Sequence, residues 1–169
     1  MASPAKRVCR RDHLNVVRNE LIGAAIEGDA VLINNLLQEL SSSERDSILK
    51  PADVNSSDDI AFHMFEEATG YGNLNVMSCL VENGADVNVR SKGCQRMPLM
   101  SASEFDELDA VKFLVEHGAR VDLQDRRGET CLHHAASQGS VASHEPLRYL
   151  LDRGADINAL TKLMTKTLP

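Results

Sequence analysis

Residues 84–88 read GADVN, and close copies of this pentapeptide recur as GARVD at 118–122 and GADIN at 154–158. A degenerate copy, PADVN, occupies residues 51–55. Successive copies are separated by 33, 34 and 36 residues. Repetition at this period is typical of a solenoid, in which each unit buries its apolar face against the next unit.

Two segments of helical character precede each full copy. An apolar segment lies directly before it: CLVEN at 79–83, FLVEH at 113–117 and YLLDR at 149–153. Further upstream lies an alanine-containing segment: FEEATGYG at 65–72, LMSASEFD at 99–106 and LHHAASQG at 132–139. A fourth such segment, LIGAAIEG at 21–28, precedes the degenerate copy. Small alanines allow successive helices to approach closely. A glycine after the second helix suits a left-handed helix end, and an extended hairpin should follow.

With these elements in register, the sequence resembles the ankyrin-repeat family. The family pattern, roughly DxxGxTPLHxAAxxGHxxVVxxLLxxGADVN, is matched most fully between Asp125 and Asn158, where Thr130, Leu132 and His133 stand for its TPLH element. The resemblance covers about residues 19–158. It implies an all-α solenoid of stacked helix–turn–helix units with short β-hairpin loops. The repeats fall at about 19–55, 58–88, 92–122 and 125–158, the first of them degenerate.

The segments around these repeats carry further expectations. Residues 1–11 contain KRVCRR and are expected to form a disordered basic tail, with a nuclear-import or phosphate-binding cluster as the alternative. Residues 12–27 are expected to form a helix that caps the stack, so the repeat domain spans 12–158. Ser41 and Glu44 have capping-box spacing, which favours a short extra helix or a surface loop at 41–50. Residues 159–169 could start a fifth repeat, and further repeats or another chain would then cover this end.

Composition restricts the class of protein. The chain has 169 residues, of which 43% are hydrophobic and 25% charged, as in an ordinary globular domain. Its net charge of -7 speaks against a nucleic-acid partner. No apolar run suggests a membrane span or a signal peptide, and the four cysteines are widely spaced. We therefore expect an intracellular protein, cytoplasmic or nuclear, with reduced thiols.

Cys131, His133 and His134 invite a test for a zinc site or a cysteine enzyme. Side chains at adjacent helical positions point about 100° apart, so the two histidines cannot easily chelate one ion. Cys131 lacks a base at a suitable spacing. We therefore expect no metal, no cofactor and no catalytic residue. The resemblance instead implies that His133 is a hydrogen-bonding residue that ties its helix to the hairpin.

Function should then depend on surfaces. The repeat register predicts an exposed stripe along the inner helices, which in ankyrin proteins lines the concave groove. The stripe comprises Gly23, Ile26, Glu27, Glu67, Gly70, Tyr71, Ser101, Glu104, Phe105, His134, Ser137 and Gln138. Tyr71 and Phe105 occupy the same register in adjacent repeats. They form either semi-buried packing or the anchors of an interface.

Basic residues gather in the later hairpin segments. These are Arg90, Lys92, Arg96, Arg126, Arg127, Lys162 and Lys166. Either they are merely solvated charges, or they form a basic ridge that attracts an acidic protein or peptide. The function expected from the sequence is therefore non-enzymatic binding of a protein or peptide on the groove and hairpin tips, without a small-molecule substrate.

Two narrower alternatives stay open. The sequence is somewhat similar to the ankyrin region of feminization-type substrate receptors of cullin ubiquitin ligases, which would make the groove a reader of degradation signals. It is also similar to inhibitor-type ankyrin proteins that mask transcription factors, for which the acidic helical side would be the relevant surface.

Overall fold

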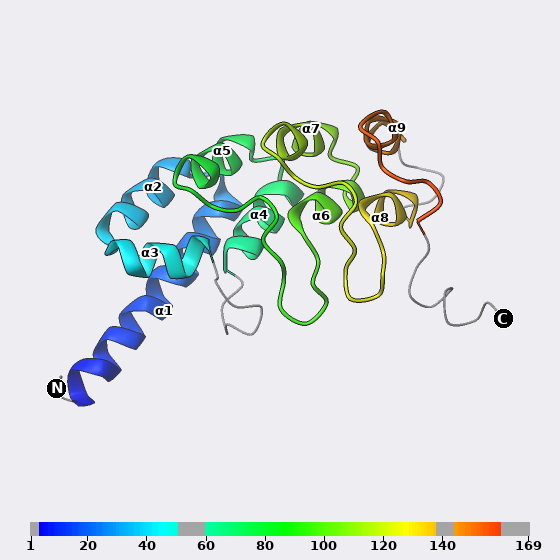
Figure 1. Cartoon of the computed structure of the whole chain (residues 1–169). Helices are drawn as coiled ribbons and strands as arrows, with labels where there is room; N and C mark the ends of the chain where they lie inside the picture. Colours follow the sequence, from blue (N-terminus) through cyan, green and yellow to red (C-terminus); the bar gives the residue numbers. More distant parts are fainter. Residues whose placement is uncertain (1–3, 51–59, 138–143, 160–169) are drawn as a thin grey trace.

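The computed structural model describes residues 4–50, 60–137 and 144–159. The chain folds into a stack of helix pairs arranged in two rows (Figure 1). The inner row contains α1 (Pro4–Glu27), α4 (Ile60–Gly70), α6 (Pro98–Glu104) and α8 (Cys131–Ser137). The outer row contains α2 (Ala30–Glu39), α5 (Leu74–Glu82), α7 (Leu108–Glu116) and α9 (Glu145–Asp152). The all-α solenoid expected from the sequence is confirmed.

The inner helices contact one another in the order α1, α4, α6 and α8, and the outer helices follow in parallel. Alanines make the close inner contacts possible: Ala25, Ala68 and Ala102 are all 0% exposed. In the outer row, Leu80 and Leu114 have no exposed surface and fill the layer between repeats. Small residues of the inner helices and leucines of the outer helices thus form one continuous hydrophobic core along the stack.

Each later repeat closes its outer helix in the same way. Gly84 has a φ of +87°, which a residue without a side chain adopts at little cost. The amide of Gly84 donates to the carbonyl of Val81 (2.9 Å), and the amide of Ala85 donates to that of Leu80 (2.9 Å). This Schellman pattern recurs after α7 and α9, at Gly118 and Gly154. It explains why the glycine of each pentapeptide follows the apolar segment directly.

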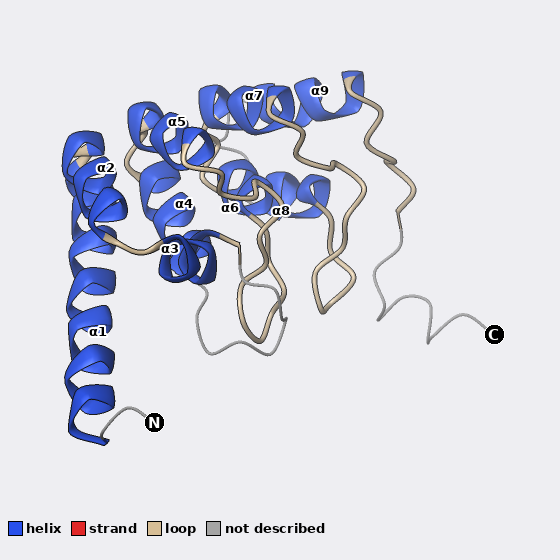
Figure 2. Cartoon of the chain, turned by 60° about the vertical axis from the view of Figure 1, so that its left-hand side comes forward, coloured by secondary structure: helices blue, strands red, loops and turns tan. Residues whose placement is uncertain are grey.

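The loops between repeats project to one side as fingers (Figure 2). Among the described residues these fingers contain no strand; in the first of them the amide of Ser91 donates to the carbonyl of Arg96 (2.8 Å). The Asp86 side chain accepts from the amide of Asn88 (2.9 Å), which bends the chain into a turn where a ladder would otherwise begin. The described fingers are therefore loops closed by turns, and not the expected β-hairpins.

The N-terminal part differs from expectation. Helix α1 begins at Pro4, so residues 4–11 continue the capping helix instead of forming the expected disordered tail. Proline suits the first helical position, and no glycine or second proline interrupts residues 5–22. The extra helix at 41–50 is confirmed as α3 (Ser42–Leu49), with the Glu44 carboxylate accepting from the amide of Ser41 (3.1 Å). Gln138, Lys162 and Lys166 lie outside the described residues.

Candidate functional site

Exposed apolar side chains follow the turns that join inner to outer helices. We call this set the turn row: Ile26, Val31, Tyr71, Leu74 and Phe105. Tyr71 is 62% exposed and Phe105 47%, whereas Phe62 and Phe65 are only 2% and 0% exposed. The tyrosine follows the end of α4, and the phenylalanine caps α6 at the equivalent position. Val31 and Leu74 were not predicted from the sequence, because both lie at the start of outer helices and the expected stripe covers inner helices only.

The turns of neighbouring repeats are joined by hydrogen bonds and packing. The Asn73 amide group donates to the carbonyls of Ala25 (3.0 Å) and Ile26 (3.1 Å), which links the second turn to the first. The Phe105 ring lies beside Gly70, since a Cβ built there would be 3.6 Å from its Cε2 atom. Phe105 therefore packs with one part of its ring and exposes the rest, while Tyr71 is mainly exposed.

The remaining stripe residues do not share one environment. Ser101 is 0% exposed and His134 is 9% exposed, so the expectation that these two side chains face solvent is wrong. They lie one helical turn before the exposed end of their helices, and the close packing of α4, α6 and α8 covers that position. Glu67 and Glu104 are half-buried, whereas Ile26, Glu27, Gly70 and Ser137 are exposed and Gly23 is half-buried. The accessible part of the stripe is thus confined to the helix ends.

A polar network connects the repeats beneath this surface. Arg96 forms an ion pair with Glu104, and its Nη2 atom lies 3.5 Å from the Ser101 hydroxyl. The same hydroxyl lies 3.5 Å from the Glu66 carboxylate of the preceding repeat. On the other side, the Glu104 carboxylate is 3.7 Å from Nδ1 of His134 in the following repeat. Residues 66, 96, 101, 104 and 134 therefore join three repeats, a link that residue spacing alone did not reveal.

The basic residues of the fingers have specific neighbours. Arg90 donates to the carbonyl of Gln124 (3.2 Å), and Arg126 donates to that of Gly93 (3.2 Å), so each arginine ties one finger to the next. Arg127 pairs with Glu129 at 3.1 Å. Lys92, Arg126 and Arg127 are exposed, and Arg90 is half-buried. The fingers thus carry accessible positive charge, although Arg96 lies in the polar network.

Cys131 and His133 have separate structural contacts. The buried Cys131 thiol donates to the carbonyl of Val121 (3.3 Å), and burial raises its pKa to about 12. His133 Nδ1 accepts from the amide of Thr130 (3.2 Å) and lies 2.9 Å from its hydroxyl, which ties α8 to the finger before it. The hydrogen-bonding role implied for His133 is confirmed. The side chains of Cys131, His133 and His134 therefore contact different partners, and the three do not form one site.

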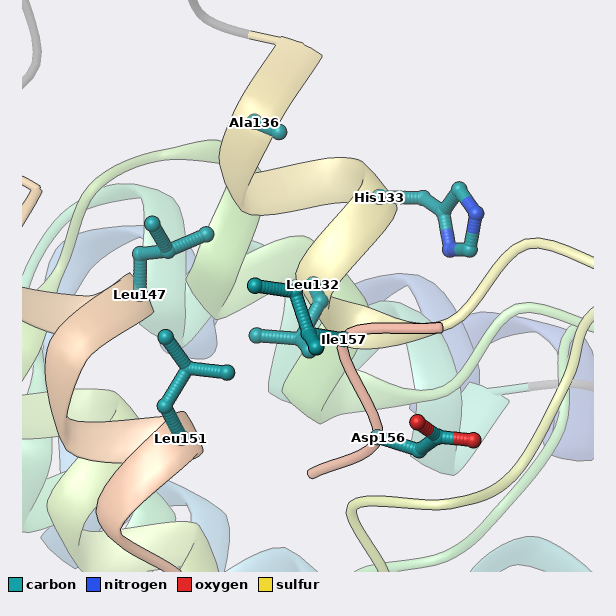
Figure 3. Close-up of a pocket in the computed structure, with 7 residues that line it drawn as sticks. All are labelled: Leu132, His133, Ala136, Leu147, Leu151, Asp156 and Ile157. Carbon is teal, nitrogen blue, oxygen red and sulfur yellow. The ribbon is translucent and has the colours of Figure 1, made fainter. Parts of the chain in front are cut away.

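An apolar pocket opens at the C-terminal end of the described stack. It has a volume of about 270 Å³. Figure 3 shows Leu147 and Leu151 of α9 facing Leu132 of α8 and Ile157, with His133 and Asp156 turned away. Ile157 is 73% exposed. The cover expected for this end, further repeats or another chain, stays a prediction.

No described helix combines the length and the apolar character that crossing a membrane requires.

Comparison with known proteins shows which family the chain resembles. The chain is 43% identical over 91 residues to human Ankyrin repeat and SOCS box protein 6, an alignment that covers 52% of this chain and 22% of that protein. It is 34% identical over 112 residues to Alpha-latrocrustotoxin-Lt1a of Latrodectus tredecimguttatus, covering 65% of this chain and 8% of the toxin. With E3 ubiquitin-protein ligase hecd-1 of Caenorhabditis elegans it shares 36% identity over 83 residues, covering 49% of this chain and 3% of the ligase.

The chain therefore spans about a fifth or less of the length of these relatives. The family model for ankyrin repeats, in three copies, matches residues 64–161. This range contains most of the second helix pair, the third and fourth pairs, and the two fingers between them. The chain belongs to the ankyrin-repeat family.

Proposed function

We propose that this ankyrin-repeat chain captures a protein or peptide partner, with Tyr71 and Phe105 as the central anchors. The observation that carries the proposal is the exposure of these two rings, 62% and 47%, at equivalent positions of adjacent repeats. Aromatic side chains at the centre of an interface commonly contribute about 2 kcal/mol or more when truncated to alanine. Exposed apolar side chains that lie together often mark an interaction site.

The surroundings of the anchors favour a partner with both apolar and acidic side chains. Ile26, Val31 and Leu74 extend the apolar surface along the turns, so the partner should present apolar side chains in a row. Contacts from Glu67, Glu104 and Ser137 on the inner helices would supply hydrogen bonds beside it. Exposed Lys92, Arg126 and Arg127 on the fingers favour an acidic stretch and would accelerate its association at low salt.

The test compares three forms of the intact chain in affinity purification from cell extract. The first is the unmodified chain, the second carries Tyr71→Ala with Phe105→Ala, and the third carries Val16→Ala. Val16 is a matched control because it is an apolar side chain, 54% exposed, on α1 outside the turn row. Once a partner is identified, its Kd for each form is measured by calorimetry.

We expect the double variant to bind at least about 30-fold more weakly, which corresponds to about 2 kcal/mol. The Val16 variant should bind as the unmodified chain does. All forms should show the same far-ultraviolet circular dichroism, since neither ring is buried. A correctly folded double variant that binds every partner with unchanged Kd removes the turn row from the proposal.

A second candidate function is substrate recognition within a ubiquitin ligase. Two relatives favour it by name: one combines ankyrin repeats with a SOCS box, and another is an E3 ubiquitin-protein ligase. On this proposal the turn row would bind a protein destined for ubiquitination. Removing the complete protein from cells should then lengthen the partner's half-life, and re-expression with both aromatic substitutions should not restore it. An unchanged half-life in both conditions contradicts this candidate while leaving the binding function intact.

A further inference from the structure

Three potential metal ligands converge between α8 and the finger that precedes it. Asp125, Glu129 and His134 each offer one ligand atom, and these atoms all lie within 4.8 Å of one another. Asp125 is only 2% exposed and His134 only 9%. The Nε2 atom of His134 is buried, turns toward Asp125 and has no hydrogen-bond partner among the described residues. A buried ring nitrogen without a hydrogen bond is costly, so this atom is available to a ligand.

The spacing of the donors suits a small cation. His134 Nε2 lies 3.5 Å from Oδ2 of Asp125. Zinc bonds of about 2.1 Å in a tetrahedron place two ligand atoms about 3.4 Å apart, so this pair needs almost no movement. The other oxygen of Asp125 accepts from the amides of Arg127 (2.8 Å) and Glu129 (2.9 Å). Those two bonds fix the carboxylate so that its Oδ2 atom is turned toward the histidine.

The second nitrogen of His134 is also placed as in metal-binding histidines. Its Nδ1 atom lies 3.7 Å from the Glu104 carboxylate, which in turn pairs with Arg96. When Nε2 binds a metal, the proton of the imidazole lies on Nδ1, where a carboxylate can accept it. The polar network between the repeats therefore orients the histidine toward the cluster.

We propose that Asp125, Glu129 and His134 form a Zn²⁺ site. Imidazole with carboxylate suits zinc, whereas Mg²⁺ and Ca²⁺ prefer oxygen ligands alone. The site opens to a pocket of about 350 Å³, which these residues line together with Cys94, Arg96 and Arg127, and which gives the ion a path of entry. Bound zinc would join the finger to α8 and keep at least one coordination position for water. This role is separate from the proposed capture of a partner on the turn row.

Arg127 sets the strength of the site. Its guanidinium pairs with Glu129 at 3.1 Å and so competes with the ion for that carboxylate. Replacing Arg127 by alanine should release Glu129 and tighten zinc binding. Loss of the positive charge alone would also favour a cation, so a gain that depends on the Glu129 carboxylate should disappear in the Arg127→Ala, Glu129→Gln double variant.

The experiment titrates ZnCl₂ into chelator-treated intact chain by isothermal calorimetry. A Cys94→Ser background removes the exposed thiol that lines the same pocket. We expect one ion per chain, an affinity at least about 10-fold lower in Glu129→Gln, and a higher affinity in Arg127→Ala. His117→Gln is the matched control, because His117 is exposed and its Nδ1 lies 2.7 Å from the Phe113 carbonyl, away from the cluster. It should bind zinc as the background does.

Several outcomes would overturn the proposal. One is the absence of stoichiometric binding by a folded chain, which would leave His134 as a buried histidine between the carboxylates of Glu104 and Asp125. Another is an affinity that is the same in the Glu129→Gln, Arg127→Ala and background chains. If His134→Gln is too unstable to purify, the Glu129 and Arg127 variants still decide, since both side chains lie near the surface. Equal binding of Mg²⁺ would contradict the assignment to zinc.

Discussion

Replacing Asn88 by alanine should weaken the junction between the second and third repeats. The Asn88 side chain closes the pentapeptide GADVN, donating to the carbonyl of Gly118 (3.1 Å) and accepting from the amide of Arg120 (2.9 Å). It thus bridges two successive copies of the motif. A typical hydrogen bond contributes about 0.5–1.5 kcal/mol net, and these groups are partly exposed. We therefore expect Asn88→Ala to lower the free energy of unfolding by about 1–2 kcal/mol.

Urea unfolding followed by circular dichroism measures this change. The urea concentration at the midpoint of unfolding should fall, and the transition should broaden if the repeats on either side of the junction unfold separately. Asn35→Ala is the control, since Asn35 is an exposed residue of α2 whose side chain has no hydrogen bond within the described part of the chain. Its effect should stay within about 0.5 kcal/mol. If the two variants unfold at the same urea concentration, the hydrogen bonds of Asn88 do not stabilise the junction.

Four further predictions concern the core, the histidines and the thiols. Leu114→Ala should cost about 2–5 kcal/mol of unfolding free energy in urea, because the side chain is 0% exposed, and a loss below about 1 kcal/mol would contradict its packing role. Both His133→Ala and His134→Ala should lower the free energy of unfolding, by about 1–3 kcal/mol each. The reason is that His133 bonds to Thr130, whereas His134 is buried beside Glu104 and Asp125. A stable His134→Ala chain with altered partner binding would instead support the expectation that His134 belongs to the exposed stripe. At pH 8 a thiol reagent should label exposed Cys94 much faster than Cys79 or Cys131, whose pKa values burial raises. As the pH rises, the Cys131 thiol ionises in the unfolded chain before it ionises in the folded chain, because burial raises its pKa only in the folded chain. The buried thiol therefore contributes fully to stability below about pH 9, and this contribution is lost as the pH rises toward about 12. Cys131→Ala should not show this loss.

The order of helices and turns follows from the sequence because each repeat must satisfy the same backbone constraints. A glycine with φ near +90° ends α5, α7 and α9, and the periodic apolar positions require each unit to pack on its neighbours. The capping box at Ser41 likewise specifies α3 locally. These features depend on residues close together in the chain, so spacing alone predicts them.

Residue spacing also placed Tyr71 and Phe105 at equivalent positions, but it did not decide what surrounds them. Whether a side chain at a given register faces water depends on the distance to the next helix and on the size of the residues between. Close packing over alanines buries Ser101 and His134, while the helix ends leave both aromatic rings accessible.

What the amino-acid sequence by itself determined is therefore the repeat, the family and the positions that correspond between repeats. Only the tertiary structure decided that Asp125 and Glu129 of a finger meet His134 of a helix, with Glu104 of the preceding repeat behind it. Such meetings depend on how each repeat is stacked and rotated upon the last. Local periodicity does not specify that rotation, because it is set by the packing of side chains that lie about 30 residues apart in the chain.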